Sequence, residues 1–337
     1  MGVAFSGHIT RVVPVDESSQ VGQVRREASS VALQAGFDDV DVGRVAIVAT
    51  EIATNVLRHG QGGRVLLSLV EGRAGKGVEM CGIDRGPGFS LAQCLPDGYS
   101  TAGSQGQGLG AIQRQAAVLD VWSDAQGAVV LARVYAADAH DHDVAYGALR
   151  IPLRHEVVCG DGWRLDMEGP RLTVTLVDGL GHGLQASEAA ELGIAAAADA
   201  CAQPADEIVR RMHVRMSRSR GGAAGVCRYD ADTGQLQFAG IGNISAVLYE
   251  SGGARGLPSH PGIVGGMFRR VHPFAFQARP GSLLLMHSDG LQTRWNFTRY
   301  AGLAYRHPAL VVAVLQRDYD RGRDDTGIIA VRLGGTA

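Results

Sequence analysis

Four aspartates in the C-terminal half of the chain lie at the edges of predicted strands, each beside a glycine or a second acid. Carboxylate oxygens are hard ligands that select Mg²⁺ or Mn²⁺, and the scarcity of histidine beside them disfavours zinc. Two such ions can bridge a water, lower its pKa and direct it at a phosphorus atom. One Asp-Gly pair alone is usually a turn, but four in similar positions predict a metal site. The four are Asp161, Asp178, Asp289 and Asp324.

The stretch VDGLGHG, residues 177–183, has a glycine at every second position after an apolar run. It is compatible with a phosphate loop, a metal site or a tight turn. The metal site is favoured, because a glycine after Asp178 lets the backbone approach an ion and offers the Gly179 carbonyl as a ligand. His182 on this turn is expected to be an exposed loop residue rather than a proton donor to a leaving group. Arg321 and Arg323 are equally compatible with phosphate binding and with surface charge.

The N-terminal half contains a pair of side chains suited to acid–base and metal chemistry. Glu51 and Asn55 are four residues apart in a predicted helix and therefore share one face. The glutamate can activate a hydroxyl or water, and the amide oxygen of the asparagine can hold a divalent ion. By themselves the two are also compatible with an exposed polar stripe.

Two further segments of this half are suited to binding a nucleotide. Asp84 follows an apolar strand and precedes Gly86 and Gly88, so its carboxylate can accept a hydrogen bond from an amino group on a base. The glycine-rich residues 103–110 (GSQGQGLG) open a helix, whose N-terminus can bind phosphates. Taken singly, the first segment is equally an ordinary turn, and the second matches neither the Walker nor the dinucleotide spacing.

The elements that position these residues form two blocks with no repeat between them. Up to about residue 135, the periodicity predicts helices over 41–59 and 109–119 and strands over 64–70, 78–83 and 128–134. From about residue 148, several strands with a few long helices predict an α/β sandwich rather than alternating βαβ units. The predicted helices here cover 186–202, 205–218 and 308–317, and the strands cover 157–158, 172–177, 223–229, 236–239, 246–249, 283–287 and 328–333.

Two domains are therefore expected, over residues 1–136 and 148–337, joined by a linker over 137–147. The linker contains DAHDHD, which is expected to be a solvated loop rather than a metal site. The chain has 337 residues and a formal net charge of -2, so no basic field indicates nucleic acid or an anionic membrane. Five scattered cysteines without a CxxC pair, and no signal peptide or long apolar run, predict a cytoplasmic protein.

The order of the N-terminal segments resembles the N, G1 and G2 boxes of the GHKL ATPase superfamily. Over roughly residues 10–135 the chain is most similar to the small serine kinases of bacterial partner-switching systems. Residues 97–101 (DGYST) resemble specifically the RsbT-type switch kinases of stressosomes. The resemblance implies a Bergerat-type ATP-binding α/β sandwich that uses ATP and Mg²⁺.

This resemblance also implies roles for individual residues. Glu51 would be the base that acts on the protein hydroxyl, and Asn55 a Mg²⁺ ligand. Asp84 would bind adenine within its glycine turn, and the glycine-rich segment would cover the phosphates. Gln107 departs from the pattern, because a small or apolar residue is more usual between the lid glycines. The implied cofactor-binding set is Asn55, Asp84, Gly86, Gly88, Gly106, Gly108, Leu109 and Gly110.

The C-terminal block, over roughly residues 148–334, resembles the SpoIIE-type branch of the metal-dependent serine/threonine phosphatases, the PPM superfamily, with the RsbX type nearest in length. The four aspartates and the stretches AGIGNI (239–244), PGIVG (261–265) and RPGSLLL (279–285) carry the resemblance. It implies an α/β/β/α sandwich with two Mn²⁺ or Mg²⁺ ions, whose bridging hydroxide attacks phosphoserine or phosphothreonine. The implied metal ligands are Asp161, Asp178, the Gly179 carbonyl, Asp289 and Asp324, the last preferred over Asp325 as the first residue of its pair.

The combined expectation is an α+β bifunctional regulator. Its first domain would phosphorylate a STAS-domain antagonist or stressosome scaffold protein on Ser or Thr. Its second domain would dephosphorylate the same or a related protein. The alternative is that the first domain only sequesters a partner, with ATP serving structurally, and that only the phosphatase turns over. A sigma factor or a downstream phosphatase is a further candidate partner, and neither nucleic acid nor a membrane is expected as one.

Overall fold

The computed structural model describes residues 2–73, 75–88, 108–136, 143–251 and 253–334. The chain forms two compact units, one over residues 10–144 and the other over 1–9 together with 145–337. The predicted two-part division therefore needs correction at both ends of the first domain. Residues 1–9 belong with the C-terminal unit because β1 (Val3–Ser6) pairs antiparallel with β8 (Asp161–Glu168). The second boundary falls between residues 144 and 145, near the end of the predicted linker.

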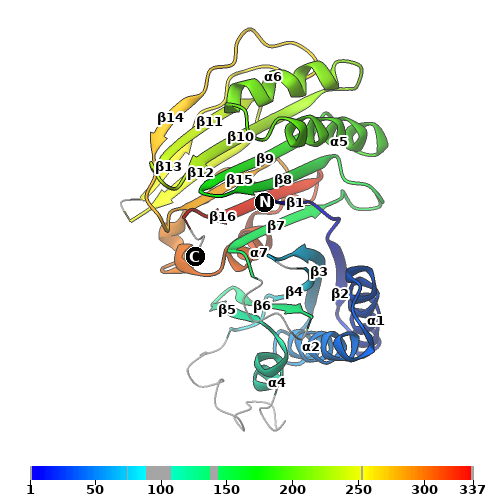
Figure 1. Ribbon diagram of the computed structural model, residues 1–337. Helices are drawn as coiled ribbons and strands as arrows, with labels where there is room; N and C mark the ends of the chain where they lie inside the picture. The colour runs from blue at the N-terminus through cyan, green and yellow to red at the C-terminus, as the bar shows by residue number, and fades with distance from the viewer. Residues whose placement is uncertain (1, 74, 89–107, 137–142, 252, 335–337) are drawn as a thin grey trace. The chain divides into compact units, whose positions relative to one another are not determined.

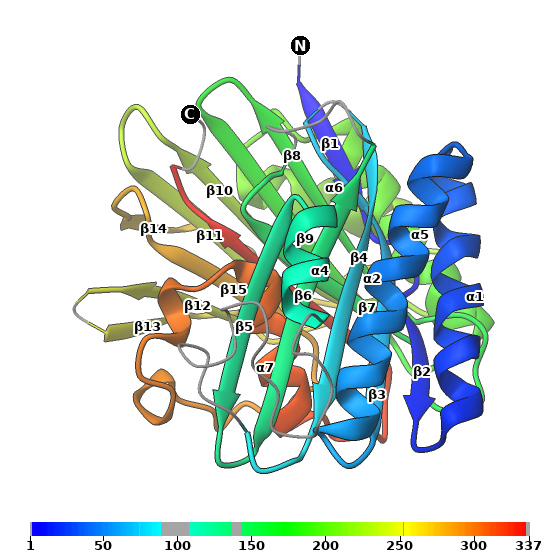
Figure 2. The same ribbon diagram turned by 90° about the horizontal axis from the view of Figure 1, so that it is seen from below.

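The unit over residues 10–144 is a two-layer sandwich. Its five strands are antiparallel in the order β2-β3-β4-β6-β5, and three helices pack on the sheet (Figure 2). Apolar residues from α1, α2 and the inner face of the sheet form one core, which includes Val24, Ile52 and Met80. The strands are β2 (Arg11–Val15), β3 (Gly63–Glu71), β4 (Lys76–Asp84), β5 (Val118–Asp124) and β6 (Gly127–Tyr135), and the helices are α1 (Ser18–Ala35), α2 (Asp39–Arg58) and α4 (Gly108–Gln115).

The other unit packs two antiparallel sheets face to face between helices (Figure 1). Helices α5 (Leu184–Asp199) and α6 (Ala205–Met216) cover the first sheet, and α7 (Pro308–Tyr319) covers the second. The first sheet has the order β1-β8-β9-β10-β11-β14, with β9 (Arg171–Gly179), β10 (Gly222–Asp230), β11 (Gln235–Ile241) and β14 (Phe274–Gln277). The second has the order β13-β12-β15-β16-β7, with β7 (Tyr146–Ile151), β12 (Ser245–Glu250), β13 (Gly253–Leu257), β15 (Leu283–His287) and β16 (Thr326–Arg332).

The predicted α+β class and both sandwich types are confirmed. The long helices lie within a few residues of their predicted bounds, but the helix predicted over 109–119 ends at Gln115, and residues 118–124 form β5 instead. The strand predicted at 157–158 is wrong, because β8 begins only at Asp161. Residues of β1, β2 and α1 were not assigned to elements from the sequence. Among the described residues, no helix is long and apolar enough to cross a membrane.

Candidate active sites

Two of the predicted metal ligands face each other across a strand pair. Asp161 is the first residue of β8, Asp178 is the penultimate residue of β9, and the two are register partners. Asp161 is almost fully buried, and its Oδ2 accepts a hydrogen bond of 2.7 Å from the Ser288 hydroxyl. The strand pairing therefore brings together carboxylates that are 17 residues apart in the sequence.

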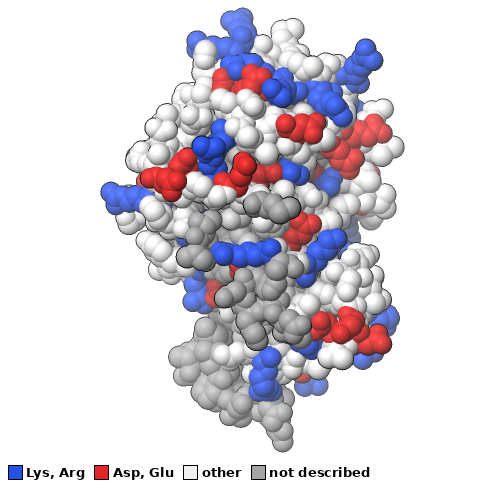
Figure 3. Space-filling model, viewed as in Figure 1, with Lys and Arg blue, Asp and Glu red and all other residues white. Residues whose placement is uncertain are grey.

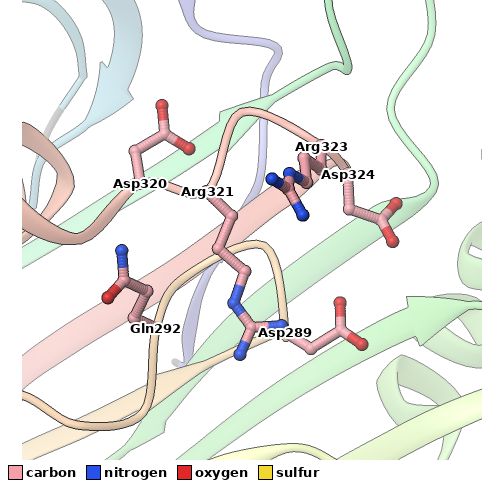
Figure 4. Close-up of a pocket in the computed structure, with 6 residues that line it drawn as sticks. All are labelled: Asp289, Gln292, Asp320, Arg321, Arg323 and Asp324. Carbon is pink, nitrogen blue, oxygen red and sulfur yellow. The ribbon is translucent and has the colours of Figure 1, made fainter.

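The other two predicted ligands come from loops next to β15 and β16. Asp289 follows β15, and its Oδ2 accepts a hydrogen bond of 2.8 Å from the Asn243 amide. Its backbone N–H donates to the Asp178 carboxylate. Asp324 lies two residues before β16, and its carboxylate points to the same side as that of Asp289 (Figure 4). All four predicted aspartates thus belong to one cluster.

The electrostatics of the cluster show like charges close together. Burial raises the pKa of Asp178 to about 7, with further contributions from the negative charges of Asp289 and Asp324. Burial and the charge of Asp178 also raise the pKa of Asp161 well above its usual value. The pKa of Asp324 is raised by burial and by the charge of Asp289. A divalent cation would offset this repulsion and favour the ionised carboxylates.

The donor set fits hard divalent cations, because it consists of carboxylate and backbone oxygens. Within the part of the chain that the structure describes, no three His, Cys, Asp or Glu side chains already form a closed cage for one ion. The cluster is therefore a set of converging carboxylates, with Asp161 held by Ser288 and Asp289 held by Asn243. These hydrogen bonds orient the acids in the way that outer partners orient metal ligands.

The choice between Asp324 and Asp325 is supported by their hydrogen bonds. Both carboxylate oxygens of the buried Asp325 are already occupied, since Oδ1 accepts from the Leu153 backbone at 2.6 Å and Oδ2 from the Gly160 backbone at 2.7 Å. Asp324 Oδ1 accepts only from the Asp325 backbone among the described residues. Asp325 thus has the role of tying β16 to the start of β8, and Asp324 is the acid with free acceptor capacity.

The glycine stretch that follows Asp178 is explained by close backbone packing. A side-chain carbon at Gly179 would lie 2.2 Å from the Ala186 carbonyl oxygen, so the start of α5 can approach β9 only at a glycine. Gly181 and Gly183 have φ values of 80° and 77°, which other residues adopt rarely. His182 lies between them, half-exposed, and its Nδ1 is 2.8 Å from Glu156 Oε1. His182 is thus an exposed residue of the turn, as expected from the sequence.

Arg321 and Arg323 line the same pocket as Asp289 and Asp324. The pocket has a volume of about 410 Å³. The Arg321 side chain extends from its loop toward Asp289, and Arg323 lies beside Asp324 (Figure 4). Both arginines are exposed and lie beside acidic residues, so phosphate binding and surface charge both stay compatible with the structure.

Two residues of this site were missed from the sequence. Ser288 and Asn243 hold the carboxylates of Asp161 and Asp289. Asp325 was considered only as an alternative metal ligand, and its role in tying the strands together was not predicted. Asn243 lies in the AGIGNI stretch, which indicated the family but not a contact. Nothing in the spacing of Ser288 or Asn243 shows that they reach an acid 127 or 46 residues away.

In the unit over residues 10–144, Glu51 and Asn55 lie on α2 beside the beginning of α4. A side-chain carbon at Gly108 would be 3.0 Å from Glu51 Oε2 and 3.4 Å from Asn55 Oδ1. The N-terminus of α4 is thus next to both polar side chains, and the glycine leaves room there. Leu109 and Gly110 follow in the first turn and are buried. This arrangement fits a phosphate-bearing ligand with a divalent ion, because a helix N-terminus attracts anions.

Asp84 ends β4 and is fixed by two backbone groups. Its Oδ1 accepts hydrogen bonds from Gly86 at 2.9 Å and from Ala128 at 3.0 Å. No partner is recorded for Oδ2 among the described residues, so this oxygen is available to a ligand. Gly88 has a φ of 70° and lies against the Asp124 backbone. In the turn predicted to bind a base, the Asp84 carboxylate is therefore held in place by backbone hydrogen bonds at the end of β4.

Several predicted features lie outside the described residues. They are Gly106, Gln107, the DGYST segment and most of the DAHDHD stretch. Of the last, Asp143 is described, and its Oδ1 accepts hydrogen bonds from Arg133 at 2.7 Å and from the Tyr135 hydroxyl at 2.9 Å.

Comparison with known proteins agrees with this architecture. The family described as "Histidine kinase-like ATPase domain" matches residues 13–134, and "Stage II sporulation protein E (SpoIIE)" matches residues 168–333. Serine/threonine-protein kinase RsbT of Bacillus subtilis (strain 168) is 32% identical over 91 residues, which are 27% of this chain and 68% of RsbT.

Two solved structures resemble more than half of the chain. One, published as "The bacterial stressosome: a modular system that has been adapted to control secondary messenger signaling", has a TM-score of 0.53 and 28% identity, covering 56% of this chain and 98% of its own. A structure of RsbX in complex with magnesium has a TM-score of 0.50 and 18% identity, covering 56% of this chain and 94% of its own. The second likeness concerns the fold alone.

The chain belongs to the family of RsbT serine/threonine kinases through its histidine kinase-like ATPase unit, and it also contains a SpoIIE-type metal-dependent phosphatase unit. It is therefore an enzyme of the kinase and phosphatase classes that serve partner switching, with a nucleotide-binding domain and a metal-dependent domain.

Proposed function

We propose that this chain both adds a phosphate to and removes a phosphate from serine or threonine residues of STAS-domain partner proteins. The observation that carries the proposal is the convergence of Asp161, Asp178, Asp289 and Asp324 beside two arginines, in a chain that also has a kinase-type nucleotide site. Opposing activities in one chain suit a switch whose output depends on which reaction a partner or a metabolite favours.

In the phosphatase unit, the four aspartates and the Gly179 carbonyl would hold two Mn²⁺ or Mg²⁺ ions. When bound, such ions would supply the chemistry of a water with a lowered pKa that acts as nucleophile. Ser288 and Asn243 keep the Asp161 and Asp289 carboxylates in place through their hydrogen bonds. Arg321 and Arg323 would bind the oxygens of the phosphoryl group, since guanidinium groups match phosphate geometry.

In the kinase unit, Glu51 would accept the proton of the substrate hydroxyl, and Asn55 would help to hold Mg²⁺. Asp84 would accept a hydrogen bond from the adenine amino group through its free Oδ2, with Gly86 and Gly88 shaping the turn. Gly106, Gly108, Leu109 and Gly110 would enclose the phosphates, and Gly108 adjoins both α2 side chains. A general base typically contributes 10²–10⁴-fold to such a transfer.

The proposal is tested with the purified full chain and a purified STAS-domain protein. Labelled ATP and Mg²⁺ should transfer phosphate to a serine or threonine of that protein. Removing ATP and adding Mn²⁺ should then release the phosphate, and a chelator should stop the release. If the phosphorylated partner loses no phosphate under any metal condition, the phosphatase half of the proposal is wrong.

A second function, sequestration, is distinguished in the same experiment. There the ATPase-type unit would only bind a partner, such as a sigma factor, and ATP would serve structurally. No phosphate transfer together with tight sigma-factor binding would support sequestration and contradict the kinase. The proximity of Glu51 to the beginning of α4 favours transfer, because a base beside the phosphate-binding helix has a catalytic use.

A further inference from the structure

The sheet covered by α5 and α6 has a polar patch at its far end from the aspartate cluster. Arg171 begins β9 and Asp178 nearly ends it, so the patch lies about 23 Å from the cluster at about 3.3 Å per residue. A pocket of about 320 Å³ opens there. It is bounded by strands β9, β10 and β11 and by the segment that joins α5 to α6.

Strand register places the polar side chains of this pocket on one face. Arg228 of β10 is the register partner of Thr173 on β9 and of Gln237 on β11. In the next row, Asp230 pairs with Arg171 and with Gln235. Side chains of register partners lie on the same face of a sheet, and Val226 on this face packs in the core under α5 and α6. The patch therefore continues the helix-covered face beyond the helices.

Arg228 is the unusual residue of this pocket. Its Nε is buried without a hydrogen-bond partner, and no hydrogen bond or ion pair is recorded for its guanidinium among the described residues. Burial and the positive charge of Arg171 lower the pKa of Arg228. The Arg228 side chain as a whole is only partly buried, but a buried donor such as its Nε is costly without an acceptor. Beside a cavity, this atom points to an acceptor that is not part of the chain.

The acids near Arg228 only partly compensate its charge. Asp230 is half-buried, its carboxylate lies 3.6 Å from Arg171 Nε, and its Oδ1 accepts three hydrogen bonds from Asp232 and Thr233. The charge of Glu168 acts on Arg228 more weakly than that of Asp230. The start of α6 adds a weak positive field, but Asp206 and Glu207 in its first turn oppose it. Two arginines, one acid and two glutamines therefore leave an excess of donors.

We propose that this pocket binds the phosphate group of a small molecule, with Arg228 as its main ligand and Arg171 as the second. A phosphate offers more acceptor oxygens than a carboxylate, which matches two guanidinium forks and the amides of Gln235 and Gln237. The volume suits a phosphate with a few additional atoms, at the lower limit of small-molecule sites. This site is separate from the aspartate cluster and does not depend on the catalytic roles proposed above.

Cys201 provides a local probe of the pocket. It follows α5, its carbonyl accepts a hydrogen bond of 3.2 Å from Thr173 Oγ1, and its thiol acts electrostatically on Arg228. Cys201 is half-buried, whereas the other described cysteines, Cys81, Cys159 and Cys227, are buried. Alkylation of the full chain by iodoacetamide, followed peptide by peptide with mass spectrometry, therefore reports on this pocket and not on the metal or nucleotide sites.

Inorganic phosphate, at constant ionic strength, should slow alkylation of Cys201 by about threefold or more once it exceeds its dissociation constant severalfold. Arg228→Gln should abolish this protection and Arg171→Gln should weaken it. Arg211→Gln should retain it, because that exposed arginine of α6 pairs with Glu207 instead. The rate without phosphate in each variant checks that the pocket is intact.

Glycerol 3-phosphate and malonate distinguish the possible ligands. Stronger protection by glycerol 3-phosphate identifies an organic phosphate as the ligand, and equal protection identifies free phosphate; both support the site. Equal protection by malonate, equal slowing in Arg228→Gln, or no slowing in the unmodified chain would each overturn the proposal.

Discussion

The two candidate active sites use opposite ways of bringing polar groups together. In the C-terminal unit, Asp161 and Asp178 are register partners of two strands, and their charges are close and partly buried. In the N-terminal unit, Glu51 and Asn55 lie on one helix face, and the backbone of Gly108 approaches them. A sheet can force like charges together, and a helix N-terminus can attract an anionic ligand through its backbone N–H groups.

The two sites differ in their local charge, and this difference does not extend to the molecular surface as a whole. On the face drawn in Figure 3, acidic and basic groups of the described residues are interspersed, without a broad area of one sign. The repulsion within the aspartate cluster is therefore a local property of that site. On this basis we expect the aspartate cluster to be the more sensitive of the two sites to loss of a charge, and the α2–α4 site to be the more sensitive to added bulk.

The largest effect is expected for Asp178→Asn. This change removes an acid at the centre of the cluster and should lower phosphatase activity by roughly a thousandfold or more, since bound metals contribute several kcal/mol. Release of phosphate from the phosphorylated partner measures it. Asp166→Asn is the matched control, because Asp166 lies on β8 but pairs with Arg164. Equal losses in both variants would contradict a role specific to the cluster.

Glu51→Gln should lower phosphate transfer by about 10²–10⁴-fold, the usual contribution of a general base. ATP binding, measured by calorimetry, should be nearly unchanged because the side chain keeps its shape. Glu27→Gln on α1 serves as the control, since Glu27 only pairs with Arg11 at 2.6 Å. Loss of ATP binding together with activity would assign Glu51 to ligand binding rather than to proton transfer.

Phe5→Ala tests the unexpected division of the chain. Phe5 is buried in the C-terminal unit and stacks on Tyr146 at 5.3 Å. Its truncation should cost this unit about 3–5 kcal/mol of stability. Urea unfolding followed by phosphatase activity and by ATP binding would separate the two units. Leu33→Ala is an exposed control on α1, and a loss confined to ATP binding would refute the division.

Ser288→Ala removes the hydroxyl that donates to Asp161 and should weaken Mn²⁺ activation by about 10–100-fold, as for other outer partners of metal ligands. The Mn²⁺ concentration for half-maximal phosphatase activity measures this change. Ser282 is a buried serine that directly precedes β15, whereas Ser288 directly follows it. The control variant Ser282→Ala should leave that concentration unchanged. An unchanged Mn²⁺ requirement in Ser288→Ala would show that this hydrogen bond does not position Asp161.

Gly108→Ala is expected to have the smallest effect. The added methyl would lie 3.0 Å from Glu51 Oε2, and crowding of this kind costs about 1–3 kcal/mol, or roughly tenfold in ATP affinity. Gly43→Ala on α2 has open space around the new methyl and should leave the affinity unchanged. If both variants bind ATP equally well, steric fit at the beginning of α4 is not what limits the kinase site.

Much of the architecture is local in origin and could be predicted. Helix α2, which contains Glu51, and the helices of the C-terminal unit follow from a 3.6-residue apolar period. Their predicted bounds are close to those found. The first two residues of β5 were mistaken for helix because residues 118–119 extend the apolar pattern of α4. β1 and α1 were missed, because short strands and helices with a weakly apolar face give a weak periodic signal.

The sequence by itself determined the chemical inventory of this protein. Acid-glycine pairs after apolar runs, a Glu–Asn pair at helical spacing and a glycine-rich helix start identified two kinds of site. Only the tertiary structure decided how these groups meet. It joined β1 to the C-terminal sheet and brought Ser288 and Asn243 to the aspartates. It also left the Nε of Arg228, beside a second pocket, without a hydrogen-bond partner among the described residues. The reason is physical: periodicity records local burial, whereas register and hydrogen bonds between distant residues exist only once the sheets have formed.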